Sequence, residues 1–275
     1  MSAAFLRAGV AGLARADCVR GRCALRLILV LCVLALSDAG MNPVRAEPPR
    51  FSIVAPGIGY ATFKVRSAEA EPFSGHAFRI DLDEAELRLV PAGDLPSARR
   101  TVEQIAAPFP AVVAVNASFF DTEGRAMGLA VDNGRVIASG RQRGWGALVI
   151  DGTAARIVLG ADIEDPRARG LVVQGIPRLL VAGRVLQLKP QIAERTAVCA
   201  EGHVVVLVVS TRTEATAFAR FLADAPEKGG LGCWDALNLD GGPSTQLVAK
   251  LPALALSLPG GWGVPNALVA TPGKR

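Results

Sequence analysis

Short apolar runs separated by glycine-containing turns fill the chain from residue 51 onward. Two-residue signals such as Asn-Gly and Asp-Gly stand between pairs of these runs, which is typical of β-hairpins. The hairpins predicted in this way are 128–131 with 135–138, 145–150 with 155–159, 178–181 with 184–187, and 195–200 with 203–209. Further strands are expected in pairs at 51–66 and 77–90, and singly at 111–115, 171–173, 234–239, 245–249 and 266–270.

Two segments show helical patterns instead. Residues 101–107 begin with Thr101 and carry Gln104 three positions later, which is the pattern of a capping box. Residues 214–224 place apolar side chains on one helical face. Together the elements predict one α+β domain over residues 51–275, dominated by mixed, largely antiparallel strands with a few helices.

The first 46 residues have the pattern of a secretory signal. Four arginines between positions 15 and 26 precede the ten-residue apolar run at 27–36, and small residues follow at 37–39 and 44–46. Ten apolar residues fall short of the ~20 that span a bilayer. We therefore expect 1–46 to be a signal peptide and link, and the mature protein to start near Glu47 or Gly40. It would be periplasmic or secreted, without a transmembrane span.

Charge and composition exclude several classes of function. Residues 1–46 contain six Arg and two Asp, which leaves 24 basic and 23 acidic side chains in the rest of the chain. A nearly neutral body argues against a nucleic-acid partner. The chain has two His and no phosphate-binding loop, so we expect neither a metal, a cofactor nor Ser-His or Cys-His catalysis.

Two cysteines, Cys199 and Cys233, lie in the body of the chain. In an exported domain they could form a disulfide, or they could be two separate buried thiols. Cys199 ends the strand that begins at Arg195, and Cys233 precedes the strand that leads to Asp240. If Arg195 and Asp240 share a pocket, the two cysteines are within bridging range.

Polar residues follow two apolar strands and are the main candidates for chemistry. Asn116 ends the strand in VVAVNASFFD, and Asp240 leaves the strand in WDALNLDGGPST. Gly241 and Gly242 permit a tight turn and a close approach of a ligand, and successive N–H groups there could bind an anion. Each segment could also be an ordinary turn.

Weaker candidates lie on other strands. Arg195 begins a strand and could clamp a phosphate, although a lone Arg there is more often a surface residue. Gln174 precedes a turn and could face the same place.

In their order along the chain, these segments resemble the phosphodiester glycosidase domain, loosely from Phe51 and more closely over residues 111–270. The motifs that carry the resemblance are VNASFFD, GLAVDNGRVIASG, WGALVIDG, the stretch 174–183, ERTAV, DALNLDGGPST and VPNALVA. The family usually has Asn-Gly-Gly-Phe-Phe where this chain has Ala117 and Ser118 after Asn116. It usually has Asp-Gly-Gly-Gly-Ser where this chain has Pro243, which lacks an N–H.

The resemblance implies an exported hydrolase that cleaves the bond between a sugar and a phosphodiester. Its expected catalytic residues are Asp240, Arg195 and, as a weaker second carboxylate, Asp121. The residues expected to bind a carbohydrate or sugar-phosphate substrate are Asn116, Gln174, Gly241, Gly242, Ser244, Thr245 and Asn266. The alternative is a non-catalytic glycan- or phosphosugar-binding envelope protein on the same fold, and Pro243 keeps that alternative open.

Overall fold

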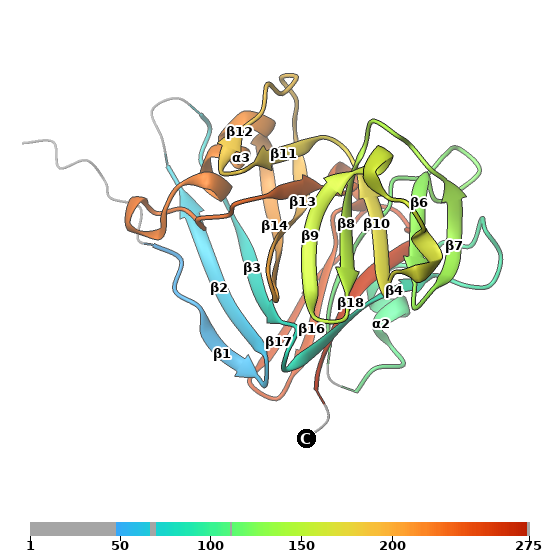
Figure 1. The fold of residues 1–275 in the computed structure, drawn as a ribbon. Coiled ribbons are helices and arrows are strands. Elements are labelled where there is room, and N and C mark those ends of the chain that lie inside the picture. The colour runs from blue at the N-terminus through green and yellow to red at the C-terminus, as the bar shows by residue number, and fades with distance from the viewer. Residues whose placement is uncertain (1–47, 67–69, 111, 274–275) are drawn as a thin grey trace, which may run out of the picture. The chain divides into compact units, whose positions relative to one another are not determined.

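The computed structural model describes residues 48–66, 70–110 and 112–273 (Figure 1). The expected signal peptide and Ala111, the first residue of one predicted strand, lie outside these residues. Within them, no helix is long and apolar enough to span a membrane.

Antiparallel pairing joins the strands into three sheets. The first has the order β1-β2-β3-β14-β13-β15-β11-β12, the second β7-β6-β10-β8-β9 and the third β17-β16-β5-β18-β4. The strand bounds are β1 Ser52–Ala55, β2 Ile58–Val65, β3 Phe73–Asp81, β4 Ala85–Pro91, β5 Val112–Asn116, β6 Gly128–Asp132, β7 Arg135–Gly140, β8 Gly146–Asp151, β9 Ala154–Leu159, β10 Leu171–Gly175, β11 Arg178–Val181, β12 Arg184–Val185, β13 Ile192–Glu201, β14 Val204–Glu214, β15 Ala236–Asn238, β16 Leu247–Leu251, β17 Leu254–Leu258 and β18 Asn266–Pro272.

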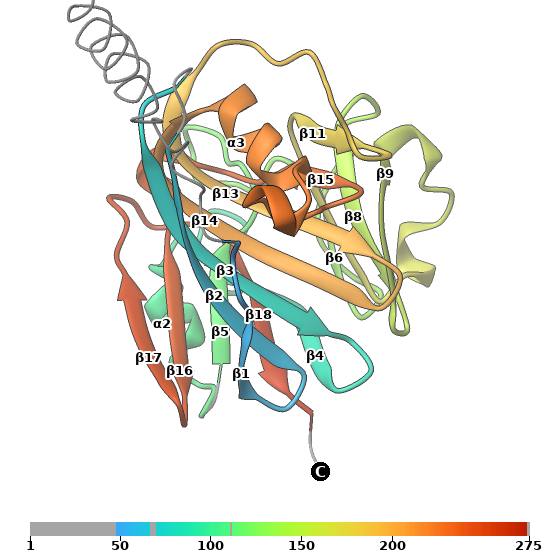
Figure 2. The same cartoon turned by 90° about the vertical axis from the view of Figure 1, so that its left-hand side faces the viewer.

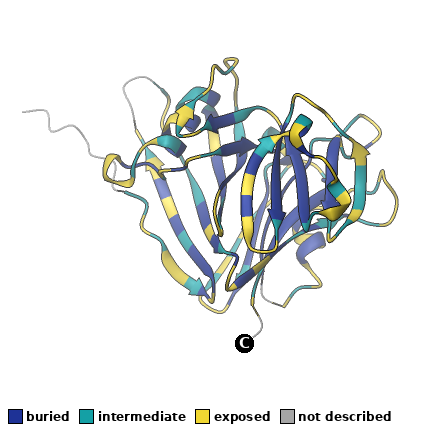
Figure 3. Cartoon of the chain, in the orientation of Figure 1, coloured by how far each residue is buried: buried dark blue, intermediate teal, exposed yellow. Residues whose placement is uncertain are grey.

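The three sheets share one apolar core, and several central strands are buried on both faces (Figure 3). In β5, Val113 and Val115 belong to the shared core, whereas Val112 and Ala114 pack in a second cluster with helix α2. Alternate side chains of a strand point to opposite faces, so a strand covered on both sides needs an unbroken apolar run. This explains why the sequence of β5 does not alternate.

Among the described residues, two α-helices cover the outer faces of sheets. Helix α2, Val102–Ala106, begins at Thr101, whose side chain accepts from the Gln104 N–H while the Gln104 side chain accepts from the Thr101 N–H. Helix α3, Ala215–Ala223, lies against the first sheet (Figure 2) and buries Phe218 there. Both predicted helices are present within one residue of their expected bounds.

The balance of elements differs from the expected α+β class. The described residues form largely antiparallel sheets with two short α-helices, so the fold is sheet-dominated and mostly β. The strand expected at 234–239 is shorter, as β15, because the chain leaves the sheet after Asn238 to form the Asp240 turn. Strand β17 was not predicted, although Leu254, Leu256 and Leu258 alternate with small or polar residues.

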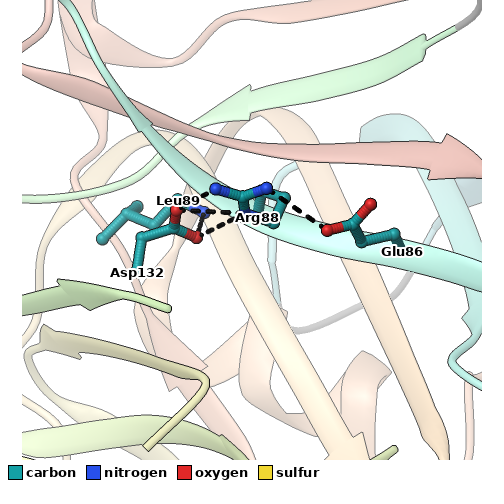
Figure 4. Close-up of polar contacts among 4 residues, drawn as sticks. All are labelled: Glu86, Arg88, Leu89 and Asp132. Atoms are coloured by element: carbon teal, nitrogen blue, oxygen red, sulfur yellow. Dashed lines mark hydrogen bonds and ion pairs between the residues drawn. The ribbon is translucent and has the colours of Figure 1, made fainter. Parts of the chain in front are cut away.

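A charged contact joins the second and third sheets (Figure 4). On β4, the Arg88 Nε donates to both carboxylate oxygens of Asp132 on β6, at 2.9 and 3.0 Å, and the Leu89 N–H donates to the same carboxylate at 3.0 Å. Glu86 pairs with the other side of the guanidinium at 3.3 Å. A planar guanidinium matches a carboxylate in this two-oxygen geometry, so the contact fixes the relative position of the two strands.

Candidate active site at the ends of three strands

Strands from two sheets deliver polar residues to one buried place. Asn116 ends β5 of the third sheet, Thr196 lies in β13 of the first sheet, and Asp240 follows β15. The segment Thr245–Gln246, which leads into β16, completes the group. The sequence separations are large, so this site exists only once the sheets have packed.

The Asn116 amide connects these segments and is itself fully buried. Its oxygen accepts from the Thr196 hydroxyl at 2.8 Å and from the Gln246 N–H at 3.1 Å, and its nitrogen donates to the Asp240 carbonyl at 2.7 Å. The amide nitrogen of Asn116 therefore positions the backbone of Asp240, and both acceptor positions of the amide oxygen are used by the protein. That Asn116 also contacts a sugar stays a prediction.

The Asp240 carboxylate is partly buried at the edge of this network. One of its oxygens accepts from the Gly241 N–H at 2.9 Å. Burial raises the pKa of Asp240 above its ordinary value, while the nearby Ser244 hydroxyl and the Gly241 N–H oppose the rise. The Ser244 hydroxyl is buried near this carboxylate, and no other hydrogen bond of normal geometry joins that hydroxyl to a described residue. A carboxylate with a raised pKa is a stronger base than an exposed one.

The turn after Asp240 differs from the anion-binding loop that the sequence suggested. Residues Gly242–Ser244 form a 3₁₀ turn in which the Ser244 N–H donates to Gly241 at 3.2 Å and the Thr245 N–H donates to Gly242 at 2.9 Å. The Gly241 N–H already donates to the Asp240 carboxylate, and Pro243 has no N–H. Gly242 is therefore the remaining backbone donor of the turn, and a nest of successive free N–H groups is not formed.

Gly241 and Gly242 are needed for different physical reasons. A β-carbon on Gly241 would lie 2.7 Å from the Glu194 carbonyl oxygen, so only glycine lets the turn pack against β13. Gly242 has a φ of 58°, in the left-handed region that glycine adopts without strain.

The backbone of Arg195 lies beside this turn, but its side chain contacts another segment. The guanidinium donates to the Gln191 carbonyl and, at 3.5 Å, to the Gln191 side-chain oxygen. Burial lowers the pKa of Arg195, and the negative charge of Glu214 partly offsets that effect. Among the described contacts none joins Arg195 to Asp240, although one guanidinium nitrogen, Nε, is buried without a partner.

Two further amides predicted to bind substrate are occupied by the protein. The Gln174 oxygen accepts from the N–H groups of Leu129 and Gln142, at 2.8 and 2.9 Å. Asn266 makes a reciprocal pair with Ser118, accepting from its N–H and donating to its hydroxyl, both at 3.0 Å. These residues hold loops in place. Thr245 does join the network, with its hydroxyl 3.4 Å from that of Thr196.

Asp121, the second predicted carboxylate, closes a local turn. It accepts from the N–H groups of Glu123 and Arg125 and pairs with the Arg125 side chain at 2.9 Å. The Arg125 N–H bond holds the pKa of Asp121 below its ordinary value. No described contact brings it to Asp240.

The prediction overlooked three buried polar residues of the site: Thr196, Gln246 and Asn238. The Gln246 side-chain oxygen accepts from the Val102 N–H, the first of helix α2, at 2.9 Å. The Gln246 backbone N–H donates to the Asn116 side-chain oxygen. Asn238 donates to the Ile176 carbonyl at 2.9 Å, and its own oxygen is buried without a partner. The sequence ALNL places the polar Asn238 inside an apolar strand, and that pattern could have indicated a site residue.

Metal-ligating side chains gather elsewhere in the described part of the chain. Asp81, Asp83 and His203 have ligand atoms within 4.8 Å of one another. They lie at the Glu201 end of β13, whereas the candidate site lies at its Arg195 end, and Asp83 and His203 are exposed. Cys199 and Cys233 form a disulfide with a Cα–Cα distance of 5.9 Å, linking β13 to the segment before β15.

Comparisons with known proteins identify the family and the fold. A family model described as phosphodiester glycosidase matches residues 109–271. No curated protein matches the chain. The catalytic domain of zebrafish N-acetylglucosamine-1-phosphodiester alpha-N-acetylglucosaminidase, described as auto-inhibited by its pro-peptide, is similar in structure with a TM-score of 0.61 and 20% identity. The similarity covers 84% of this chain and 88% of that one.

Two bacterial structures are also similar. A putative exported protein from Burkholderia pseudomallei has a TM-score of 0.55 and 14% identity, with 84% of this chain and 97% of that chain covered. A hypothetical protein from Synechocystis has a TM-score of 0.54 and 18% identity, with 78% and 62% covered. At these identities the similarities establish the fold.

Proposed function

This chain belongs to the phosphodiester glycosidase family, and on that premise we propose that it is an exported hydrolase that cleaves a sugar-1-phosphodiester. Water would replace the phosphodiester at the anomeric carbon, giving a free sugar and a phosphate monoester. The observation that carries the proposal is the Asp240 carboxylate, which is desolvated, has a raised pKa and is fixed by Asn116 through its own backbone carbonyl.

Asp240 is the proposed base or nucleophile. A carboxylate with a raised pKa accepts a proton from water more readily, and it can also attack the anomeric carbon as glycosidases do. A phosphodiester leaves as a stable anion, so protonation of the leaving group matters less than electrostatic stabilisation of the departing phosphate.

Three groups near Asp240 are the proposed phosphate ligands. The Ser244 hydroxyl and the Gly242 N–H lie on the turn itself, and the Ser244 hydroxyl lies beside the Asp240 carboxylate. The Arg195 guanidinium would supply positive charge if it turned from Gln191 toward the turn, which its unpartnered Nε supports. Asp121 is the weaker second carboxylate of the proposal because Arg125 already neutralises it.

A non-catalytic sugar-phosphate-binding protein is the second candidate function. The specific observation in its favour is Pro243, together with the three turn N–H groups that the protein itself occupies. A binding protein needs the ligands of the phosphate but not the raised pKa of Asp240.

Turnover of a defined substrate separates the two functions. We would use N-acetylglucosamine 1-(4-nitrophenyl phosphate), a diester that a phosphatase alone does not cleave, with a phosphatase present to release colour from the 4-nitrophenyl phosphate product. The wild type should turn over and Asp240→Asn should lose roughly 10²–10⁴-fold in kcat, the range of general-base catalysis. If this diester and its glucose and mannose counterparts bind but are not cleaved, the binding function is favoured.

Export is a separate part of the proposal. The charged and apolar pattern of residues 1–46 supports it. Sequencing the N-terminus of the protein from the periplasm or medium should find a start near Glu47 or Gly40. An intact Met1 in a cytoplasmic fraction would contradict it.

A further inference from the structure

Three buried polar side chains on one face of the first sheet each have an atom without a hydrogen-bond partner among the described residues. They are Ser210 on β14, Arg195 on β13 and Asn238 on β15, each at most 5% exposed. The free atoms are the serine hydroxyl, the guanidinium Nε and the asparagine side-chain oxygen. Leaving a buried polar atom unpaired is unfavourable, so each one calls for a partner that another state of the molecule supplies.

The strand register places these three side chains next to one another. Arg195 pairs directly with Ser210 on β14, and Ala197, two residues further along β13, pairs with Asn238 on β15. Residues two apart in a strand share a face, so Arg195 lies between the other two and Asn238 is its diagonal neighbour. Helix α3 covers this face of the sheet (Figure 2). A diagonal neighbour is within reach of a side chain as long as arginine.

Asn238 is also the residue of this face that leads into the Asp240 turn. It ends β15, and if the pairing of β15 with β13 continued by two residues, Asp240 would stand opposite Arg195. The Leu239 N–H still donates to the Thr196 carbonyl at 2.9 Å, and the chain then leaves the sheet. A guanidinium that turned toward Asp240 would therefore pass beside Asn238.

The free atom of Asn238 is its oxygen and not its nitrogen. The side-chain nitrogen donates to the carbonyls of Ile176 and Leu239, at 2.9 and 2.7 Å. A carbonyl only accepts hydrogen bonds, so the end of the amide that faces both carbonyls must be the NH₂ group. The unused atom of Asn238 is thus an acceptor, whereas the unused Nε–H of Arg195 is a donor, and the two match.

The guanidinium now lies at the opposite end of its reach, over the start of β13. It donates to the carbonyl and the side-chain oxygen of Gln191. Burial lowers the pKa of Arg195, an effect that the negative charge of Glu214 partly offsets. The Gln191 carbonyl also accepts from the Ala215 N–H at 3.2 Å, so it keeps a partner if the guanidinium leaves. A phosphate at the Asp240 turn would compete with Glu214 for this positive charge.

We propose that Asn238 is a positioning residue for Arg195, and that its side-chain oxygen accepts the Arg195 Nε–H when a phosphate is bound at the Asp240 turn. The inference rests on the proposed function for the place of the phosphate. With Nε–H held by Asn238, the two terminal nitrogens of the guanidinium are free to donate to two phosphate oxygens, which is the planar, two-oxygen geometry that arginine offers.

Binding of inorganic phosphate tests this inference without requiring turnover. Calorimetric titration of the wild type, Asn238→Ala, Arg195→Ala and the double variant forms a double-mutant cycle. Asn238→Ala should weaken phosphate binding about ten-fold in the wild-type background, the size of one hydrogen bond to a charged group, and by less than about two-fold when Arg195 is absent. A merely structural asparagine would cause the same loss in both backgrounds. That result, or no phosphate binding by the wild type, would overturn the inference.

Ser210→Ala is the matched control. Ser210 is 5% exposed against 4% for Asn238, and its hydroxyl is also unpaired within the described residues, but β14 lies on the side of β13 away from β15. Ser210→Ala should leave the affinity for phosphate unchanged. If it weakens binding and the effect disappears in the Arg195→Ala background, the arginine uses Ser210 instead and the inference is wrong.

A crystal structure of the wild type with inorganic phosphate decides the inference even if Asn238→Ala does not fold. The Arg195 Nε should lie about 2.9 Å from the Asn238 side-chain oxygen, with phosphate at the Asp240 turn. Phosphate at the turn with the guanidinium still on Gln191, or no phosphate at the turn, would overturn the inference. Diester cleavage with Arg195 unmoved would leave the proposed function standing, whereas Arg195 on Asn238 without cleavage would leave only the inference standing.

Discussion

Removing the Asn116 amide should destabilise the protein strongly, because that amide holds three segments together. In Asn116→Ala the Asp240 carbonyl and the Gln246 N–H lose their partners inside the protein. The Thr196 hydroxyl also loses its partner, but the Thr245 hydroxyl lies 3.4 Å from it and can accept its hydrogen bond instead. Two buried groups without a hydrogen-bond partner cost about 1–3 kcal/mol each, which predicts a loss of about 2–6 kcal/mol in the free energy of unfolding.

Urea unfolding followed by tryptophan fluorescence measures this loss, with an unchanged m-value as evidence that the folded state is intact. Thr196→Val removes only the hydroxyl and should lose about 1 kcal/mol. The double variant should lose less than the sum of the two single losses, by at least about 0.5 kcal/mol, because both changes remove the same hydrogen bond.

The activity of Asn116→Ala is a second readout. If Asn116 positions Asp240, kcat should fall while KM changes little. A loss of stability below about 1 kcal/mol, or additive losses in the double variant, would refute the structural role of the amide.

Three further predictions concern other parts of the molecule. Because burial raises the pKa of Asp240, the free energy of unfolding of the wild type should fall relative to that of Asp240→Asn as pH rises through that raised value. Urea unfolding at pH 4 and pH 8 should show the variant becoming more stable relative to the wild type at the higher pH, and a constant difference between the two proteins would count against the burial effect. Changing Cys199 and Cys233 together to Ser should lower the free energy of unfolding by about 3–4 kcal/mol for a loop of this length, and two free thiols in the denatured, unreduced mature protein would disprove the bond. Asp132→Asn should lower stability by about 2 kcal/mol through loss of the charged bonds to Arg88, and no change in urea midpoint would show that this contact is dispensable.

Local features of the fold were predictable from the sequence. The capping box of Thr101 and Gln104 depends on residues three positions apart, and the hairpins depend on turn residues between adjacent runs. The closed turn of Asp121 was equally local, since DTEGR places Arg125 four residues later, but the role of that carboxylate as a turn residue was not predicted.

The contacts between sheets could not be predicted in the same way. Asn116 and Thr196 are 80 residues apart, and no spacing in the sequence says that their strands end together. The side-chain direction of Arg195 and the use of the turn N–H groups also depend on tertiary packing. Strand ends rich in polar residues indicated where the candidate site lies, whereas the partners of each polar atom required the structure.

The position of bond cleavage tests the central claim most directly. The reaction would be run with wild-type protein in H₂¹⁸O on the methyl diester of N-acetylglucosamine 1-phosphate, with Asp240→Asn as the control, and the methyl phosphate product examined by ³¹P NMR for the isotope shift. If a glycosidic C–O bond breaks, the oxygen from water enters the sugar and the phosphate product stays unlabelled. Incorporation of ¹⁸O into the phosphate would show that the P–O bond breaks instead, and would contradict the assignment of this protein as a glycosidase.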